Sequence, residues 1–180
     1  MQFKSTILIL PGLNNSGESH WQTLWQEQFG FERVMQKDFD NPVCDEWIAN
    51  IDAAVTKYNA GNVILVAHSL ACTTVAAWAN RYNRKIKAAL LVAPSDTEAD
   101  SYPPGTTGFN SMFLNKLPFT SITVMSEDDY YVTTERAKYF AGCWGSEIES
   151  IGNAGHINVS SGYGVWPEGL AFLKRLDERF

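Results

Sequence analysis

The chain has 180 residues, 45% of them hydrophobic, and a formal net charge of −6 at neutral pH. This length predicts a single domain over residues 1–180, with enough chain to bury a core between layers. No basic cluster points to nucleic acid, and no apolar run approaches the roughly 20 residues of a membrane span, so neither nucleic acid nor a membrane is an expected partner.

The cysteines and the first apolar run bear on the cellular environment. Cys44, Cys72 and Cys143 are odd in number and form no Cys-x-x-Cys pair, so neither a disulfide framework nor a zinc site is expected. The apolar run that ends at Leu10 is too short for a secretory signal, and a reducing cytoplasm is the predicted location. No group of histidine, cysteine and acidic residues has metal-ligand spacing, so no metal or other cofactor is expected.

Short aliphatic runs alternate with stretches of helical periodicity along the whole chain, which is typical of a parallel sheet covered on both faces. The predicted strands are Thr6–Leu10, Glu32–Met35, Val63–His68, Ala88–Val92, Ile122–Met125 and Ile148–Ile151. The predicted helices are His20–Phe29, a helix with an acidic first turn at Asp45 and Glu46 and an apolar stripe over Trp47–Tyr58, Leu70–Tyr82, Thr134–Phe140 and Trp166–Arg179. This alternation predicts a three-layer α/β/α fold with a mostly parallel six-stranded sheet in the order 2-1-3-4-5-6.

One long segment, Ser95–Pro118, has no periodicity and is rich in proline, glycine and threonine. A loop of this length in a compact domain often covers a functional site. Ligands of such folds bind beyond the carboxyl ends of the strands, so the chemistry is expected directly after each predicted strand.

Ser69 follows the third predicted strand and immediately precedes an alanine-rich helical pattern. This strand–turn–helix layout is typical of a nucleophile elbow, in which a strained serine projects its hydroxyl above the sheet. Small residues must flank the serine, and Ala67 and Ala71 stand where glycine is usual. The alternative interpretation is a buried strand followed by a helix-capping serine.

A serine hydroxyl needs an imidazole to accept its proton, and the chain has three histidines. His156 lies in a polar loop after the last predicted strand and is the expected base. His68 should point away from the Ser69 hydroxyl by strand alternation, which favours a packing or hydrogen-bonding role. His20 opens a helix beside the first loop, so contact with a ligand is one alternative for it, but a solvated position at the start of the helix is expected.

A carboxylate should orient the imidazole, and three candidates follow strands four and five. Asp128 and Asp129 are adjacent, so their side chains diverge and only one of them can serve. Asp96 is the third candidate. The position just before the last strand and its histidine favours the Asp128–Asp129 pair.

An oxyanion needs backbone N–H donors, and Leu70 at the start of the helix after the elbow is the first expected donor. The second is expected from Leu13 or Asn14, in the loop after the first strand. Gly12 and Gly17 in that loop match neither the dinucleotide-binding nor the P-loop pattern, which disfavours a nucleotide site.

Several blocks of the chain, in order, match one known group of proteins. These blocks are Leu10–Gln22, Val66–Cys72, Ser126–Val132, Gly155–Asn158 and Tyr163–Gly169. The chain therefore resembles the small serine hydrolases related to retinoblastoma-binding protein nine and the bacterial YdeN proteins. The resemblance implies a minimal α/β-hydrolase without a cap domain and a Ser–Asp–His triad, with Asp129 as the acid. Family members usually carry glycine at the positions of Ala67 and Ala71, and often proline where Tyr130 stands.

The combined expectation is a serine hydrolase that cleaves small acyl esters through an acyl-enzyme, with thioesters and amides open to the same chemistry. Apolar walls for the substrate are expected from large side chains beyond the strand ends. These residues are Trp21, Phe109, Met112, Phe113 and Trp166.

Two other classes of function remain open at this point. One is an α/β-hydrolase-fold protein that works by binding another protein, although nothing in the sequence indicates such a partner. The other is a flavodoxin-like or nucleotide-binding domain, which would share the architecture but not the motifs.

Overall fold

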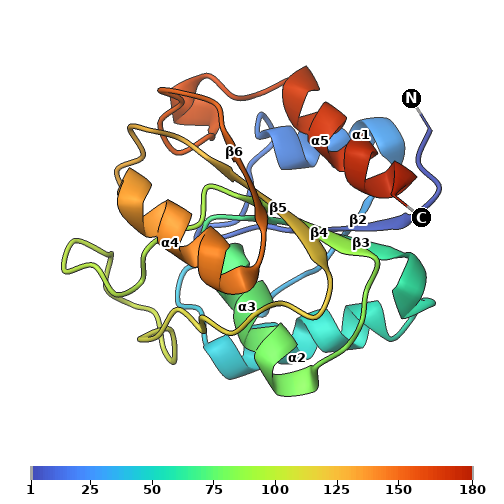
Figure 1. Cartoon of the computed structure of the whole chain (residues 1–180), viewed down its shortest axis with the longest axis horizontal. Helices are drawn as coiled ribbons and strands as arrows, with labels where there is room; N and C mark the ends of the chain where they lie inside the picture. Colours follow the sequence, from blue (N-terminus) through green and yellow to red (C-terminus); the bar gives the residue numbers. More distant parts are fainter. Residues whose placement is uncertain (1, 180) are drawn as a thin grey trace.

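The computed structural model describes residues 2–179. Within this range, six parallel strands form one sheet in the order β2-β1-β3-β4-β5-β6, which confirms the predicted fold (Figure 1). The strands are β1 (Thr6–Leu10), β2 (Glu32–Arg33), β3 (Val63–His68), β4 (Ala88–Val92), β5 (Thr120–Met125) and β6 (Glu147–Ser150). The helices are α1 (Trp21–Phe29), α2 (Cys44–Val55), α3 (Leu70–Tyr82), α4 (Thr134–Trp144) and α5 (Pro167–Glu178), with short 3₁₀ turns at Ala60–Asn62 and Val159–Ser161.

Alternate residues of the central strands enter two separate cores. In β3, Leu65 and Ala67 face the core that contains side chains of α2, α3 and α4, whereas Ile64 and Val66 face the core that contains those of α1 and α5. Figure 1 shows α2 and α3 on one side of the sheet and α1 and α5 on the other. Since both faces are covered, the strands are continuous apolar runs, as the sequence indicated.

α4 and β2 are among the elements whose lengths differ from their predictions. α4 extends beyond Phe140 to Trp144, whose indole N–H donates to the Phe113 carbonyl at 3.2 Å, and Gly145 ends the helix at φ +66°. β2 stops at Arg33 rather than Met35, a short edge strand whose last link to β1 is the Val34 N–H donating to Ile9. Packing of Trp144 therefore accounts for the extra turn of α4, and the left-handed Gly145 ends it.

The segment between β4 and β5 contains no helix or strand, as expected, yet it is anchored to the body of the protein. Thr107 pairs with Val43 in an isolated parallel bridge, and the Cys44 N–H donates to the Thr107 carbonyl at 2.9 Å. This bridge also explains why α2 begins at Cys44, directly before the acidic first turn expected at Asp45 and Glu46. Within residues 2–179, no helix combines the length and apolarity needed to cross a bilayer.

A buried carboxylate joins the two ends of the chain. Asp177 in α5 accepts hydrogen bonds from the backbone N–H groups of Lys4 and Ser5, at 3.1 and 2.9 Å, and its side chain is 0% exposed. Lys174 adds an ion pair at 3.1 Å. Burial alone would raise the pKa of Asp177, but the bonds from Ser5, Lys4 and Lys174 together hold that pKa below its ordinary value.

We expect Asp177→Asn to lower the free energy of unfolding by about 1–3 kcal/mol at neutral pH, because hydrogen bonds to a buried charge are lost. The folded-state pKa lies below the unfolded value of about 3.9, so the ionised carboxylate stabilises the fold above that pH. The contribution is lost as the pH falls through the folded-state pKa. Urea unfolding at several pH values should show the wild type and the variant converging in acid, with exposed Glu178→Gln as the control. A difference in the free energy of unfolding that stays constant across that pH range would contradict the role given to the ionised Asp177.

Candidate active site

Ser69 sits in a strained turn between β3 and α3, with φ +59° and ψ −125°. A positive φ is unfavourable for a serine and is tolerated where surrounding contacts enforce it. Ala67 and Ala71 on either side are fully buried, so only small side chains fit there. The turn has the conformation expected of a nucleophile elbow, with alanine in place of the usual flanking glycines.

The loop after β1 packs directly against this turn. A Cβ atom on Gly12 would lie 2.7 Å from the His68 carbonyl oxygen, 2.9 Å from the Ser69 Cβ and 3.2 Å from the Leu70 nitrogen. Only glycine allows this approach, which places the loop beside the first N–H of α3. The first N–H groups of a helix have no partner within the helix, so the Leu70 N–H is available to a ligand.

The two predicted alternatives for the second oxyanion donor differ in their hydrogen bonding. The Asn14 N–H donates to the Phe39 carbonyl at 2.9 Å, so it is already engaged. Leu13 and Asn14 both line the cavity in front of Ser69. The hydrogen bond of Asn14 argues against its N–H as an oxyanion donor and leaves Leu13.

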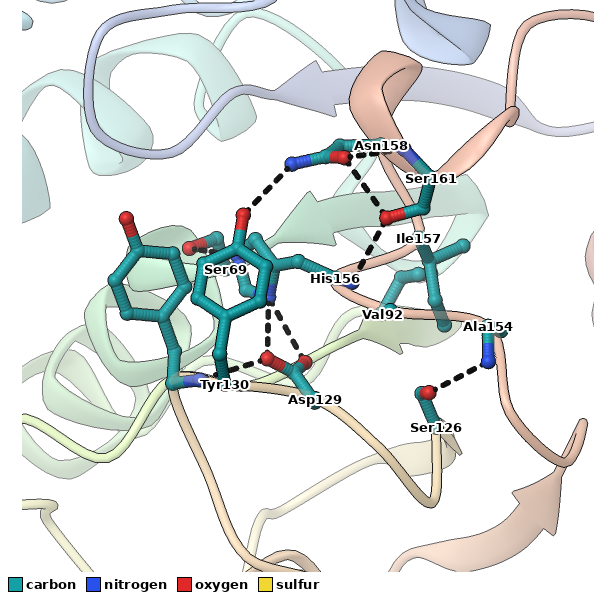
Figure 2. Close-up of polar contacts among 12 residues, drawn as sticks. Ser69, Val92, Ser126, Asp129, Tyr130, Ala154, His156, Ile157, Asn158 and Ser161 are labelled. Carbon is teal, nitrogen blue, oxygen red and sulfur yellow. Dashed lines mark hydrogen bonds and ion pairs between the residues drawn. The ribbon is translucent and has the colours of Figure 1, made fainter.

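The predicted serine and acid both lie within hydrogen-bond distance of His156, which stands between them (Figure 2). His156 Nε2 is 2.8 Å from Ser69 Oγ, and His156 Nδ1 is 2.8 Å from Asp129 Oδ2. The imidazole and the carboxylate are 4% and 0% exposed. Because a carboxylate only accepts, Nδ1 carries the proton and Nε2 is left to accept from the serine hydroxyl.

Asp128 and Asp129 bind different parts of the histidine loop. Asp128 Oδ1 accepts from the Ser126 hydroxyl at 2.8 Å and from the Gly155 N–H at 2.7 Å. These hydrogen bonds, with Ser126 as the larger cause, hold the pKa of Asp128 below its ordinary value. Asp128 therefore fixes the backbone of the loop, whereas Asp129 fixes the imidazole of His156.

Further hydrogen bonds hold the loop on both sides of His156. The Ala154 N–H donates to Ser126 Oγ at 2.9 Å, and the His156 N–H donates to Ser161 Oγ at 3.1 Å, as Figure 2 shows. Gly155 between them has φ +53°, and a Cβ there would lie 2.3 Å from Ser161 Oγ. Glycine is required at this position by both conformation and space.

The third acid candidate, Asp96, has a different partner. Its carboxylate accepts from Arg136 Nε at 2.6 Å and from a second guanidinium nitrogen at 3.0 Å. Its backbone N–H donates to the Tyr131 carbonyl at 2.9 Å. Asp96 therefore joins the long loop to the acid loop and does not contact the imidazole.

A cavity of about 260 Å³ opens in front of Ser69. Its walls are aromatic, amide, hydroxyl and imidazole groups, and they include no lysine, arginine or carboxylate among the described residues. The lining residues are Leu13, Asn14, Asn15, His20, His68, Ser69, Tyr102, Pro103, Tyr130, Tyr131, His156, Asn158, Val159 and Ser160. Within residues 2–179, no group of three or more metal-ligating side chains is found.

None of the five predicted wall residues lines this cavity, and that expectation is corrected. Trp21 and Trp166 pack together in the core under α1 and α5, and Phe109 and Met112 lie in the opposite core. Phe113 packs half-buried against that second core. Large apolar side chains gain most from complete burial, and these five are drawn into the two cores. Their size and their position beyond the strand ends were therefore not enough to predict that they line the cavity.

The walls come instead from residues next to the predicted site residues in sequence. Tyr130 and Tyr131 follow the acid directly, and Val159 and Ser160 lie in the short turn just after His156. Adjacency to a site residue was the signal that could have identified them. Tyr102 and Pro103 belong to the long loop, which was expected to cover the site.

His20 is also corrected, because it is buried rather than solvated, with 5% of its surface exposed. Its ring lies 4.9 Å from that of His68. Burial first, then the charges of Arg33 and His156, lower the pKa of His20 to about 4, and burial lowers the pKa of His68 well below its ordinary value. Both rings are therefore neutral at physiological pH. His68 hydrogen-bonds the His156 carbonyl at 2.9 Å, in keeping with its expected role.

A parallel sheet with a strained serine after its third strand, and a histidine and an acid after later strands, defines the α/β-hydrolase class. The family model for serine hydrolases matches residues 7–175, so the chain belongs to that family. Membership of this family identifies the chain as a serine hydrolase.

Solved structures share the fold of this chain. A YdeN-like protein from Pectobacterium atrosepticum is 28% identical, with a TM-score of 0.84 over 96% of this chain and 90% of that one. The ydeN product of Bacillus subtilis is 17% identical, with a TM-score of 0.78 over 98% and 100%. Est1E from Butyrivibrio proteoclasticus, solved with ferulic acid bound, is 15% identical, with a TM-score of 0.67 over 95% and 90%. A comparison with curated protein sequences gave no match.

We expect Gly12→Ala to lower the rate of aryl ester hydrolysis by about a hundredfold, because the new Cβ displaces the loop from Ser69 and Leu70. Gly17→Ala in the same loop is the matched control, since its Cβ meets nothing within 4 Å. Initial rates with a short-chain chromogenic ester would measure both variants. Equal rates for the two variants would contradict the proposed close approach.

Proposed function

We propose that Ser69, His156 and Asp129 form a catalytic triad that hydrolyses small, uncharged acyl esters through an acyl-enzyme on Ser69. The observation that carries this proposal is the continuous hydrogen-bond chain from Asp129 through His156 to Ser69, with both links at 2.8 Å. Serine, base and orienting acid within this reach are the arrangement that activates a hydroxyl nucleophile.

In the first half-reaction, Ser69 Oγ attacks the carbonyl carbon while His156 Nε2 takes the hydroxyl proton. The negative charge that develops on the carbonyl oxygen is stabilised by the N–H groups of Leu70 and Leu13. The tetrahedral intermediate collapses when the bond to the leaving oxygen breaks and His156 returns the proton to the departing alcohol. The acyl group then remains on Ser69.

In the second half-reaction, His156 Nε2 removes a proton from a water molecule, whose oxygen attacks the acyl carbon. Collapse of this intermediate breaks the bond to Ser69 Oγ, which recovers its proton from His156. The products are a carboxylic acid and the alcohol released earlier. Asp129 accepts the Nδ1–H throughout and stabilises the imidazolium that forms in each step.

The cavity supports a small and uncharged substrate. Its volume of about 260 Å³ suits a short acyl ester, and the residues that line it include no lysine, arginine, aspartate or glutamate, while His20 and His68 are held neutral. The ferulic acid in Est1E belongs to the product class of such a reaction. Thioesters and amides remain open to the same sequence of steps, with leaving groups that His156 would protonate in the same way.

The first test is intact-mass labelling with a fluorophosphonate, which forms an adduct only with an activated serine. We expect one adduct on the wild type and none on Ser69→Ala, with matching circular dichroism spectra. A folded wild-type protein that takes up no probe would contradict the triad and favour a role in binding another protein.

The adjacent acids offer a matched pair of variants. Asp129→Asn should lower kcat about 10⁴-fold, because the amide no longer fixes the productive tautomer of His156. Asp128→Asn should lower it less than about tenfold, since Asn retains the oxygen that accepts the Ser126 and Gly155 hydrogen bonds. Steady-state kinetics on a chromogenic ester would distinguish the two variants. Comparable losses of kcat in both would show that Asp129 is not the orienting acid.

A further inference from the structure

Two histidines line the cavity without contacting Asp129 or Ser69 through their ring nitrogens. His20 is the N-cap of α1, and His68 is the last residue of β3. Their ring centroids are 4.9 Å apart, and the rings of His68 and His156 are also 4.9 Å apart. The pair therefore lies directly beside the reacting groups, within reach of a short substrate.

The hydrogen bonds of His20 determine which of its nitrogens carries the proton. Its Nδ1 accepts from the Gln22 backbone N–H at 3.2 Å, so that nitrogen must hold a lone pair. The ring is neutral at physiological pH, and its proton is therefore on Nε2. Within residues 2–179, Nε2 has no hydrogen-bond partner, and His20 presents a free donor at the cavity.

His68 has the opposite arrangement. Its Nε2 lies 2.9 Å from the His156 carbonyl oxygen, and a carbonyl can only accept, so Nε2 carries the proton. The neutral ring then has a lone pair on Nδ1, for which the described part of the chain offers no donor. The cavity thus has a donor and an acceptor on neighbouring rings.

A hydroxyl group matches this pair, because one oxygen can accept from His20 and donate to His68. A carboxylate has no proton for the His68 lone pair, and an ammonium group has no lone pair for the His20 N–H. Neither ion would find an opposite charge, since the cavity lining includes no lysine, arginine, aspartate or glutamate among the described residues. Buried unpaired polar groups discriminate strongly against ligands that leave them unsatisfied.

We infer that His20 and His68 form a subsite for a hydroxyl group, and that the preferred substrates are esters with a free hydroxyl near the scissile bond. This inference rests on the proposed hydrolysis at Ser69. His20 and His68 are specificity-determining residues in this assignment, and His156 alone exchanges protons with the reacting atoms.

Two pairs of esters that each differ by one hydroxyl test the inference. Ethyl lactate is compared with ethyl propionate for the acyl side, and ethylene glycol monobutyrate with ethyl butyrate for the alcohol side. The values of kcat/KM are measured by pH-stat titration and divided by the rate constants for hydroxide-catalysed hydrolysis. We expect the wild type to favour the hydroxylated member of at least one pair by about tenfold.

Two variants each displace one hydrogen-bonding group and retain the structural contact of the histidine. His20→Asn keeps an oxygen that can cap α1, but its shorter amide places no N–H at the position of the ring Nε2. His68→Gln keeps an N–H for the His156 carbonyl, but its amide oxygen does not occupy the position of the ring Nδ1 lone pair. In each variant, the ratio of the corrected kcat/KM for the hydroxylated ester to that for its partner should be close to one. Glu27→Gln, on the exposed face of α1, should keep the wild-type preference.

The outcomes separate this inference from the proposed function. Absence of any preference, or a preference that survives in both variants, would overturn the hydroxyl subsite while the triad stands. If none of the four esters is hydrolysed while Ser69 is still labelled by the fluorophosphonate, the subsite is overturned as well. Loss of labelling in the wild type would overturn the triad itself. If His20→Asn does not fold, His68→Gln decides the result.

Discussion

The backbone strain at Ser69 is the constraint on which the rest of the site depends. A positive φ of this kind costs about 1–3 kcal/mol and persists only where the surroundings enforce it. Here the Ser69 N–H donates to Val92 in β4 at 3.0 Å, and the Ser69 carbonyl accepts from Cys72 in α3 at 2.9 Å. Buried alanines on both sides complete the enclosure. The turn is therefore held by the sheet and the helix together, and the approach of Gly12 follows from its shape.

The loop after β6, which carries His156, is held in place by hydrogen bonds from the loop after β5. Ser126 and Asp128, at the end of β5, bind the backbone of the loop that carries His156. Trp21 in α1 supports the same loop from the core, since its indole N–H donates to the Ile157 carbonyl at 2.9 Å. The position of the imidazole is thus set by backbone hydrogen bonds from two directions. The contact between His156 and Asp129 only has to orient a ring that is already in place.

The sequence was sufficient for the features that depend on local pattern. Aliphatic runs and helical spacing predicted the sheet, and strand ends followed by Ser69, Asp128–Asp129 and His156 predicted where polar groups gather. The cavity walls could not be predicted, because they depend on the path of loops through three dimensions. Met112 turns into the core from the long loop, whereas Tyr102 in the same loop reaches the cavity. The burial of His20 likewise follows from packing against His68, a contact between distant residues.

The polarity of the cavity comes from hydrogen-bonding groups rather than from charge. Arg33 donates to Asn15 and to the Ser16 carbonyl, and its charge is one of the causes that keep His20 neutral. A neutral His20 can offer an N–H without attracting an anion that would compete with the developing oxyanion. His68 connects this polar region to the base, because its N–H is donated to the carbonyl of His156 itself. In the proposed mechanism, a substrate hydroxyl that binds His68 would contact the residue that holds the His156 backbone in place, so substrate recognition and proton transfer would both depend on His68.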